Sequence, residues 1–313
     1  MVGTLIKRTP MAAIAETRHA LPHGIHLNCR HSGQPGRPVL LFLHGFPEGA
    51  FAWDAMLAHF SKPENGGYFC VAPHLRGFET SSAPTDPAAY RAKFLVQDIL
   101  ALIDIVSPRQ ALAALVAHDW GGAVAWNLAN QHPEHLQRLV IINSPHPGTF
   151  LRDLQSNPAQ QAASAYMNFL IRPDAAALLA ANDYQRLWGF FNTMANGQAS
   201  WLDTAMKDRY RAHWAHGLEG GLNYYRASPL RPPRPDDHAA SLISLPDAML
   251  RIAVPAMVIW GLQDKALLPC LIEGLDDHIP DLELHTLADA SHWVVHEQPA
   301  VVQAYIRGFL ARA

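Results

Sequence analysis

The feature that most constrains the fold is an apolar run that turns abruptly into a helix. Residues 111–117 are apolar, and residues 123–129 carry apolar side chains at helical spacing, so we expect a buried strand followed by a helix. Small residues between them, Gly121 and Gly122 among them, allow the chain to turn tightly. Asp119 stands at the centre of this turn, where its side chain would be held up at the carboxyl end of the strand.

Strands and helices alternate along much of the chain. This alternation predicts a parallel sheet covered by helices on both faces, with ligand chemistry at the carboxyl ends of the strands. Two polar-alternating stretches within 12–36 are instead typical of a hairpin at the edge of a sheet. Further strands are expected at 38–43, 68–73, 136–143, 254–260 and 282–287, and helices at 51–61, 91–107 and 294–312.

The alternation stops between residues 145 and 246. This segment has a helical pattern, is rich in alanine, contains five of the eight tyrosines and ends in a proline-rich loop. We interpret it as a helical lid inserted after the sixth strand. The predicted organisation is therefore a first part of the core over 1–144, a lid over 145–246 and a second part of the core over 247–313.

Composition narrows the class of protein. The chain has 313 residues, of which 49% are hydrophobic and 16% charged, and its net charge of -3 gives no reason to expect nucleic acid or an anionic membrane as a partner. No run approaches the roughly 18 apolar residues that span a bilayer. The first ten residues lack the apolar core of a signal peptide. The sequence leaves open the oligomeric state and whether translation starts at Met1 or Met11.

The cysteines favour a reducing compartment. Cys29, Cys70 and Cys270 are odd in number, widely spaced and flanked by apolar residues. They are interpreted as reduced core thiols, which is typical of a cytoplasmic protein.

The chemistry of a carboxylate restricts what Asp119 could attack. A serine that attacked a saturated carbon would leave an ether, which water does not hydrolyse readily, whereas a carboxylate leaves an ester that water can cleave. Asp119 as a nucleophile therefore predicts substitution at a carbon that bears a leaving group, and not acyl transfer. The alternative is that Asp119 only caps the following helix.

Three further motifs accompany this turn. His-Gly-Phe-Pro at 44–47 follows the strand at 38–43, Trp-Gly-Leu-Gln-Asp-Lys at 260–265 contains Asp264, and Ala-Asp-Ala-Ser-His-Trp at 288–293 contains His292. With these motifs, residues 20–310 resemble the α/β-hydrolases and, within that fold, the epoxide hydrolases. The order of nucleophile, acid and histidine is the one typical of this fold.

The resemblance implies a role for each motif. Asp264 would hold the imidazole of His292 in its working tautomer, and His292 would take a proton from water. In isolation, Gly-x-x-Asp is only a turn signal and a histidine before an aromatic residue is more often structural. The backbone N–H groups of Phe46 and Trp120 would stabilise the oxyanion that forms when water adds to the Asp119 ester.

The leaving group decides between two chemistries. A halide leaves as a stable anion, whereas an epoxide oxygen leaves as an alkoxide and needs a proton donor, which a tyrosine with a pKa of about 10 can be. Epoxide hydrolases place two tyrosines in the lid. The matching positions here are Tyr166, before Pro173, and Tyr225, in Leu-Asn-Tyr-Tyr-Arg at 222–226. The alternative for both is a core or interface tyrosine.

The resemblance therefore implies conversion of an epoxide to a vicinal diol through a covalent ester on Asp119. Trp120, Tyr166 and Tyr225 would also bind the substrate, which we expect to be an apolar epoxide of modest size. Water is the second substrate, and no cofactor or metal is implied.

Two other functions remain open. His-Asp-Trp-Gly at 118–121 also resembles the haloalkane dehalogenases, in which the indole after the nucleophile binds halide, and Trp188, Trp201 or Trp214 could supply a second donor. Fluoroacetate dehalogenases match less well, because they place Arg at the position of Trp120. A catalytically idle receptor with this fold is the alternative of a different class.

Two segments depart from the expected pattern. The family's Asp-x-x-Gly-x-Gly-x-Ser loop is His-Leu-Arg-Gly-Phe-Glu-Thr-Ser at 74–81, which changes a loop near the site and leaves the catalytic positions intact. His146 follows the strand at 136–143 in a hinge that opens the lid. No Cys, His or carboxylate cluster accompanies it at ligand spacing, so we do not expect His146 to bind metal.

Overall fold

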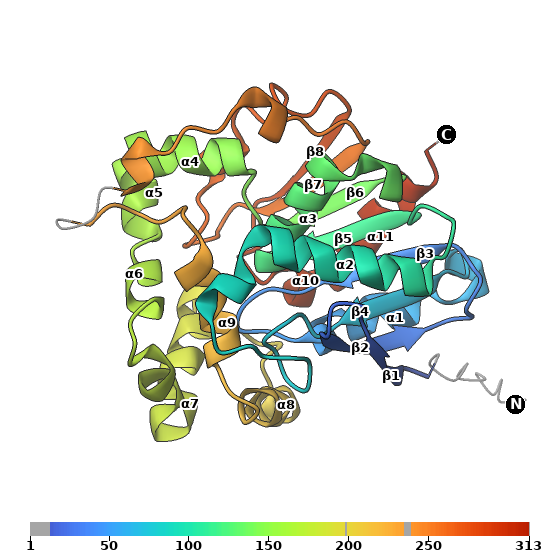
Figure 1. The fold of residues 1–313 in the computed structure, drawn as a ribbon, viewed down its shortest axis with the longest axis horizontal. Helices are drawn as coiled ribbons and strands as arrows, with labels where there is room; N and C mark the ends of the chain where they lie inside the picture. Colours follow the sequence, from blue (N-terminus) through green and yellow to red (C-terminus); the bar gives the residue numbers. More distant parts are fainter. Residues whose placement is uncertain (1–12, 198, 235–238, 313) are drawn as a thin grey trace, which may run out of the picture.

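The computed structural model describes residues 13–197, 199–234 and 239–312, and the alternative starts at Met1 and Met11 lie outside these ranges. The chain forms an eight-stranded sheet in the order β1-β2-β4-β3-β5-β6-β7-β8 (Figure 1). The strands are β1 (Ala15–Ala20), β2 (His26–Ser32), β3 (Val39–Leu43), β4 (Phe69–Pro73), β5 (Ala114–His118), β6 (Leu139–Ile142), β7 (Ala256–Gly261) and β8 (Leu282–Leu287).

The sheet is mostly parallel, as predicted. β1 and β2 form an antiparallel hairpin at one edge, and β2 pairs antiparallel with β4. All the other pairings, from β4 through β8, are parallel. The expected edge hairpin and the doubly wound α/β fold are therefore confirmed.

The central strands are buried on both faces. Every residue of β3, β4, β5, β6 and β7 is buried, because successive side chains point into two different hydrophobic clusters. One cluster joins the sheet to α2 (Ala92–Val106) and α3 (Trp120–Gln131). The other joins it to α1 (Asp54–Phe60) and α11 (Pro299–Leu310). This two-sided burial explains why the strands appear in the sequence as uninterrupted apolar runs.

The insertion between β6 and β7 is helical, and in Figure 1 its helices run along one side of the sheet. The longest, α7, is kinked, because residues 181–184 have non-helical backbone angles. The limits proposed for the lid, 145 and 246, remain a prediction. The helices are α4 (Pro147–Ser156), α5 (Pro158–Ala163), α6 (Tyr166–Leu170), α7 (Ala175–Met194), α8 (Thr204–Trp214) and α9 (Glu219–Ala227).

The prediction of one helix over 294–312 is wrong. The segment forms two helices, α10 (Val294–Glu297) and α11, separated at Gln298. Gln298 has φ -132° and ψ 52°, outside the helical region. Pro299 explains the break, because it has no N–H to continue α10 but its fixed φ suits the first turn of a new helix.

Two expectations from composition can be compared with the structure. The three cysteines are free thiols, but only Cys29 and Cys70 are buried. Cys270 is partly exposed, so its assignment to the core is wrong; it lies in the short 3₁₀ helix Pro269–Ile272 after β7, which has only one buried residue. Within the ranges that the structure describes, no helix is both long and apolar enough to cross a membrane.

Candidate active site

A strained turn presents the side chain of Asp119. The residue follows β5 and precedes α3 with φ 48° and ψ -122°, in a region that non-glycine residues rarely adopt. A Cβ at Gly121 would lie 2.4 Å from the carbonyl oxygen of Leu43, and one at Gly122 would lie 2.3 Å from Cβ of Ser144, so both positions need glycine. The Asp119 side chain makes no capping hydrogen bond to α3. The alternative of a simple helix cap is therefore wrong.

The structure brings together Asp119, Asp264 and His292. They follow β5, β7 and β8, whose carboxyl ends meet at one edge of the sheet. Nδ1 of His292 lies 2.7 Å from Oδ2 of Asp264, within hydrogen-bonding distance. Nε2 of His292, on the opposite side of the ring, lies 3.8 Å from Oδ2 of Asp119. Three residues far apart in the sequence thus form one line of interacting groups.

Charge around His292 favours its protonated form. Burial alone would lower the pKa of His292, but the charge of Asp264, its hydrogen bond and the charge of Asp119 outweigh burial and raise the pKa to about 9. Burial would likewise raise the pKa of Asp264, yet His292 and donors from Leu267 and Asn143 hold it below its ordinary value. The acid therefore remains ionised beside a histidine that binds its proton tightly.

Asn143 holds Asp264 in place, a role that the sequence did not reveal. Its amide Nδ2 donates to Oδ2 of Asp264 at 2.8 Å, and its Oδ1 accepts from the N–H of Gly261 at 2.9 Å. The other oxygen of Asp264 accepts from the N–H groups of Ala266 and Leu267 at 2.8 and 2.9 Å. The backbone of the turn after β7 therefore holds the Asp264 carboxylate in position. The available signal was the position of Asn143 directly after β6, at the same edge of the sheet.

A main-chain donor faces the carboxylate of Asp119. The N–H of Phe46 donates to Oδ1 of Asp119 at 2.8 Å. A Cβ on Gly45 would lie 2.1 Å from that oxygen, so only glycine allows this approach. Trp120 begins α3, and the first N–H groups of a helix have no intrahelical acceptor.

A buried carboxylate, Glu48, lies behind the site and was not predicted. Its Oε1 accepts from the hydroxyl of Tyr210 and pairs with Nε2 of His296, both at 2.6 Å. Its Oε2 lies 3.5 Å from Nδ1 of His118, whose Nε2 donates to the carbonyl of His292 at 2.9 Å. Burial would raise the pKa of Glu48, but His296 and His118 hold it well below its ordinary value. The only sequence signal was that Glu48 follows His-Gly-Phe-Pro and that His118 precedes Asp119.

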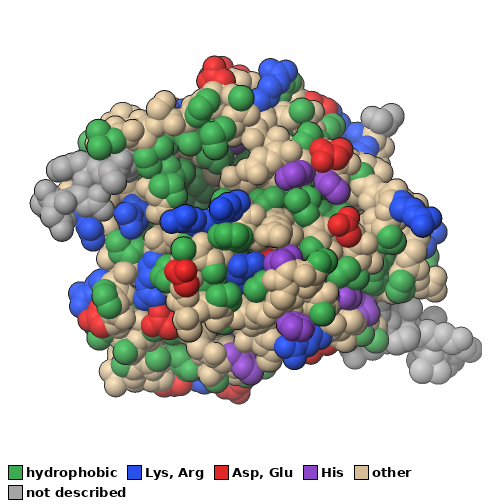
Figure 2. All heavy atoms as spheres, in the orientation of Figure 1, with side chains coloured by type: hydrophobic (Ala, Val, Ile, Leu, Met, Phe, Trp, Pro, Cys, Tyr) green, Lys and Arg blue, Asp and Glu red, His purple; other side chains and the backbone are tan. Residues whose placement is uncertain are grey.

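A cavity of about 720 Å³ opens above Asp119. Figure 2 shows hydrophobic side chains around a hollow on this face, with Lys and Arg side chains along one rim. Asp119 is the only acidic residue among those that line it, within the described part of the chain. Apolar lining residues include Leu95, Val124, Phe150, Met167, Leu230 and Ile243, and the cations include Arg91 and Lys93.

Tyr166 and Tyr225 line this cavity together with Asp119. Tyr166 begins α6 and Tyr225 lies in α9, and their ring centroids are 6.2 Å apart. The ring of Trp120 lies 4.9 Å from that of Tyr225, edge to face. Burial, together with the negative charge of Asp119, raises the pKa of both hydroxyls above the ordinary tyrosine value. Both hydroxyls therefore carry their protons and can act as hydrogen-bond donors.

The tryptophans of the helical insertion face elsewhere. The indole N–H of Trp188 donates to the carbonyl of Asp183, and that of Trp214 donates to the carbonyl of Pro47, each at 2.7 Å. Trp201 stacks on His296 with ring centroids 4.2 Å apart. Of the tryptophans in the described ranges, only Trp120 lines the cavity. A second indole donor for a halide is therefore not found there.

Comparison with known proteins agrees with this geometry. Residues 38–299 match the family described as "alpha/beta hydrolase fold". The chain belongs to this family. It is 34% identical to the AB hydrolase superfamily protein YfhM of Bacillus subtilis over 92% of this chain and 95% of that protein.

Two solved structures are also similar. An epoxide hydrolase from Bacillus megaterium, in complex with an inhibitor, is 29% identical with a TM-score of 0.83, covering 95% of this chain and 100% of that one. A structure described under "Novel epoxide hydrolases belonging to the alpha/beta hydrolases superfamily in metagenomes from hot environments" is 35% identical with a TM-score of 0.81, covering 96% of this chain and 100% of that one. The predicted resemblance to the epoxide hydrolases is thus confirmed.

Proposed function

We propose that the protein is an epoxide hydrolase that converts an epoxide to a vicinal diol through an ester on Asp119. The observation that carries the proposal is that Tyr166 and Tyr225 line the same cavity as this carboxylate. Two protonated hydroxyls opposite a nucleophile are what ring opening requires, because the epoxide oxygen must accept a proton as its bond to carbon breaks. The similar proteins named epoxide hydrolases support the same assignment.

In the first step, Asp119 attacks an epoxide carbon. The N–H of Phe46 holds Oδ1 at 2.8 Å, which leaves Oδ2 to form the bond to carbon. The carbon–oxygen bond of the epoxide breaks, Tyr166 and Tyr225 hydrogen-bond to the departing oxygen, and one of them gives it a proton and becomes a phenolate. The product is an ester whose carbonyl oxygen, Oδ1, still faces the N–H of Phe46.

In the second step, His292 activates water. Forming the ester removes the negative charge of Asp119, one of the charges that raise the pKa of His292 to about 9. The imidazole then loses its proton more readily; that proton restores the tyrosine, and the neutral imidazole, held by Asp264, acts as the general base. Water adds to the ester carbonyl as His292 takes one of its protons, and the N–H groups of Phe46 and Trp120 stabilise the oxyanion. The ester bond to the substrate then breaks, the second proton of the water passes to the leaving alkoxide, and the diol leaves with Asp119 again a carboxylate.

The alternatives have less support. A haloalkane dehalogenase would need donors for a halide, but in the described ranges only one indole, that of Trp120, lines the cavity. A catalytically idle receptor would not need the 2.7 Å hydrogen bond between His292 and Asp264 beside a carboxylate on a strained turn. Epoxide hydrolysis uses all of these groups.

The same proposal includes the kind of substrate and the location of the protein in the cell. We take residues 145–246 as a lid that closes over an apolar epoxide of modest size, which the apolar walls and the volume of about 720 Å³ would accept. The buried free thiols of Cys29 and Cys70 support a cytoplasmic location.

The experiment is intact-mass analysis of a His292→Gln variant exposed separately to an aryl epoxide and to a haloalkane. Without the base, the ester should form and persist, so the protein should gain the whole mass of the epoxide. Asp119→Asn in the same background should abolish the gain. Gain of only the alkyl group from the haloalkane would support the dehalogenase instead, and neither adduct, with no turnover by the wild type, would support the receptor.

A further inference from the structure

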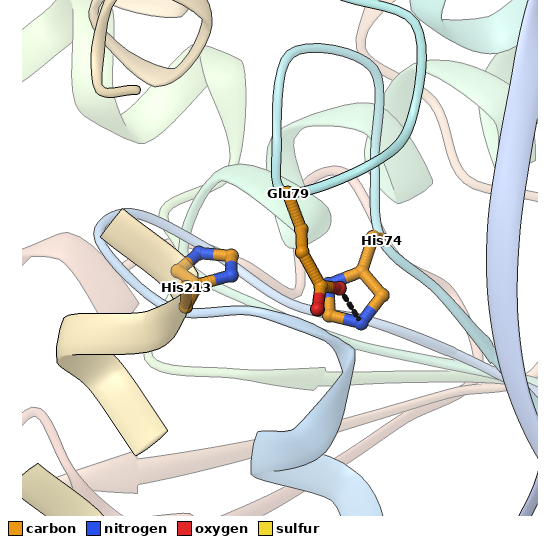
Figure 3. A group of neighbouring side chains, drawn as sticks. All are labelled: His74, Glu79 and His213. Carbon is orange, nitrogen blue, oxygen red and sulfur yellow. Dashed lines mark ion pairs between the residues drawn. The ribbon is translucent and has the colours of Figure 1, made fainter. Parts of the chain in front are cut away.

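A second cluster of ligand-type side chains lies away from the cavity, where α8 meets the core. His74 and Glu79 belong to the loop after β4, and His213 belongs to α8. One nitrogen or oxygen atom from each lies within 4.8 Å of the others (Figure 3). His74 and Glu79 form an ion pair, and both histidines are buried. Two imidazoles and one carboxylate from two separate segments thus converge on one point.

His213 presents a buried nitrogen without a partner among the described residues at this point. Its Nδ1 is buried and has no hydrogen-bond partner within the described part of the chain. The ring of His213 also hydrogen-bonds to the backbone carbonyl of Glu48. Figure 3 shows the ring of His213 turned toward the Glu79 carboxylate.

The carboxylate presents a second acceptor to the same space. Apart from the ion pair with His74, Oε2 of Glu79 has no donor among the described residues. Buried polar atoms normally have a partner, and a cation held between His213 and the Glu79 carboxylate would give Nδ1 of His213 one. The three side chains are therefore arranged as ligands of a bound cation could be.

We propose that His74, Glu79 and His213 form a binding site for a divalent transition-metal ion of the Zn²⁺ type. Two imidazoles and a carboxylate suit Zn²⁺ and its first-row neighbours, whereas Mg²⁺ and Ca²⁺ prefer oxygen ligands only. Bonds of about 2.0–2.1 Å place tetrahedral ligand atoms about 3.3 Å apart. The ligand atoms lie within 4.8 Å of one another, so the more distant ones must move closer, whereas Nε2 of His74 and Oε2 of Glu79, which already touch as an ion pair, must move apart to admit the ion.

Solvent access and space for a fourth ligand are available. The side chain of Glu79 is 27% exposed, which gives an ion a route to the site. A small void of about 10 Å³, lined by His213, Phe78 and Pro47 among others, is large enough for one water molecule beside the cluster.

Binding has an identifiable cost at His74. Its Nδ1 accepts a hydrogen bond from the N–H of Ala50 at 3.3 Å. Coordination through Nε2 requires the ring proton on Nδ1, so this contact is lost when metal binds. The bond is long and therefore weak, and losing it is a small cost beside two metal–nitrogen bonds.

The consequence is structural, because none of the three residues lines the substrate cavity. The ion would tie α8, in the helical insertion, to the loop that follows β4. It should thus raise the free energy of unfolding without being required for turnover.

The test adds Zn²⁺ alone to chelator-treated full-length protein and measures binding by competition with a chromophoric chelator, with Co²⁺ absorption as a second readout. The wild type should bind one equivalent. Glu79→Gln, which keeps the shape of the side chain, and His213→Ala should weaken binding by at least about 100-fold. Zn²⁺ should raise the melting temperature of the wild type but not that of the two variants.

Surface histidines provide the controls. His216→Ala removes an exposed histidine just after α8, and His135→Ala removes one of the partly exposed pair with His132. Both should bind Zn²⁺ as the wild type does. Unchanged binding in Glu79→Gln and His213→Ala, or no stoichiometric binding by the wild type, would overturn the proposal. Circular dichroism and metal-free epoxide turnover establish that the variants are folded.

Discussion

Oδ2 of Asp119 lies 3.8 Å from Nε2 of His292, too far for a hydrogen bond but close enough for the two charges to interact strongly. The carboxylate helps to raise the pKa of His292 to about 9 while Asp119 is free. Esterification of Asp119 removes that contribution.

The first prediction concerns this coupling. Asp119→Asn imitates the neutral ester, so the pKa of His292 should be lower in this variant than in the wild type, as measured by NMR titration of the imidazole. In single-turnover experiments, hydrolysis of the ester should speed up as the pH rises and level off below pH 9. An identical pKa in both proteins would contradict the charge coupling between the two residues.

The second prediction concerns the lid tyrosines. Tyr166→Phe and Tyr225→Phe should each reduce the rate of ester formation from an epoxide by about 10²-fold, because each removes one donor to the departing oxygen. Quenching of tryptophan fluorescence at Trp120, beside the nucleophile, offers a stopped-flow signal. Tyr305, which stacks on His285 with centroids 4.0 Å apart and does not line the cavity, provides the matched control as Tyr305→Phe. If all three variants formed the ester at the same rate, Tyr166 and Tyr225 would not be the donors to the departing oxygen.

The third prediction concerns Asn143. Asn143→Ala leaves the N–H of Gly261 without its acceptor and Asp264 without one donor, so stability should fall by about 1–3 kcal/mol. Hydrolysis of the ester should slow by about tenfold, because Asp264 holds His292 less firmly. Ester formation should change little, since Asp119 and the tyrosines are untouched. An equal decrease in the rates of ester formation and ester hydrolysis would indicate that the substitution disrupts the whole site and that Asn143 has no specific positioning role.

The fourth prediction is the dependence of stability on pH. The folded pKa of His292, about 9, lies above the ordinary value of 6.5, so the folded state binds the proton more tightly than the unfolded state. This stabilisation is complete below pH 6.5 and is lost as the pH rises through 9, with a limit of about 3 kcal/mol. Urea denaturation at pH 6 and pH 9.5 should therefore show a larger loss in the wild type than in His292→Gln. Titration of unfolded cysteines affects both proteins alike and cancels in the comparison.

Much of the fold and of the candidate site could be predicted from the sequence. Buried parallel strands are uninterrupted apolar runs, and each motif directly follows such a run. Because the carboxyl ends of parallel strands meet at one edge, residues 119, 264 and 292 could be brought together without knowledge of their coordinates. The tyrosines could be assigned only through the resemblance, since nothing local to α6 or α9 distinguishes a donor from a core aromatic.

The features that the sequence does not reveal depend on contacts between polar groups that lie far apart in the chain. Glu48 reaches His296 across 248 positions, and no local pattern encodes that pair. His74 and Glu79 meet His213 only after α8 docks on the core, so their spacing in the sequence is not that of a metal motif. The apolar periodicity continues across Pro299, so the sequence pattern does not reveal the break between α10 and α11.

The hydroxyls of Tyr166 and Tyr225 and the carboxylate of Asp119 come from different parts of the architecture. The carboxylate is fixed at the sheet edge by glycines that tolerate no side chain, whereas the tyrosines are carried by helices of the insertion. Changes in the inserted helices can therefore alter which leaving group the enzyme accepts. The residues at the sheet edge that hydrolyse the ester can stay the same. In protein engineering, the insertion would be the part to randomise and the sheet edge the part to keep.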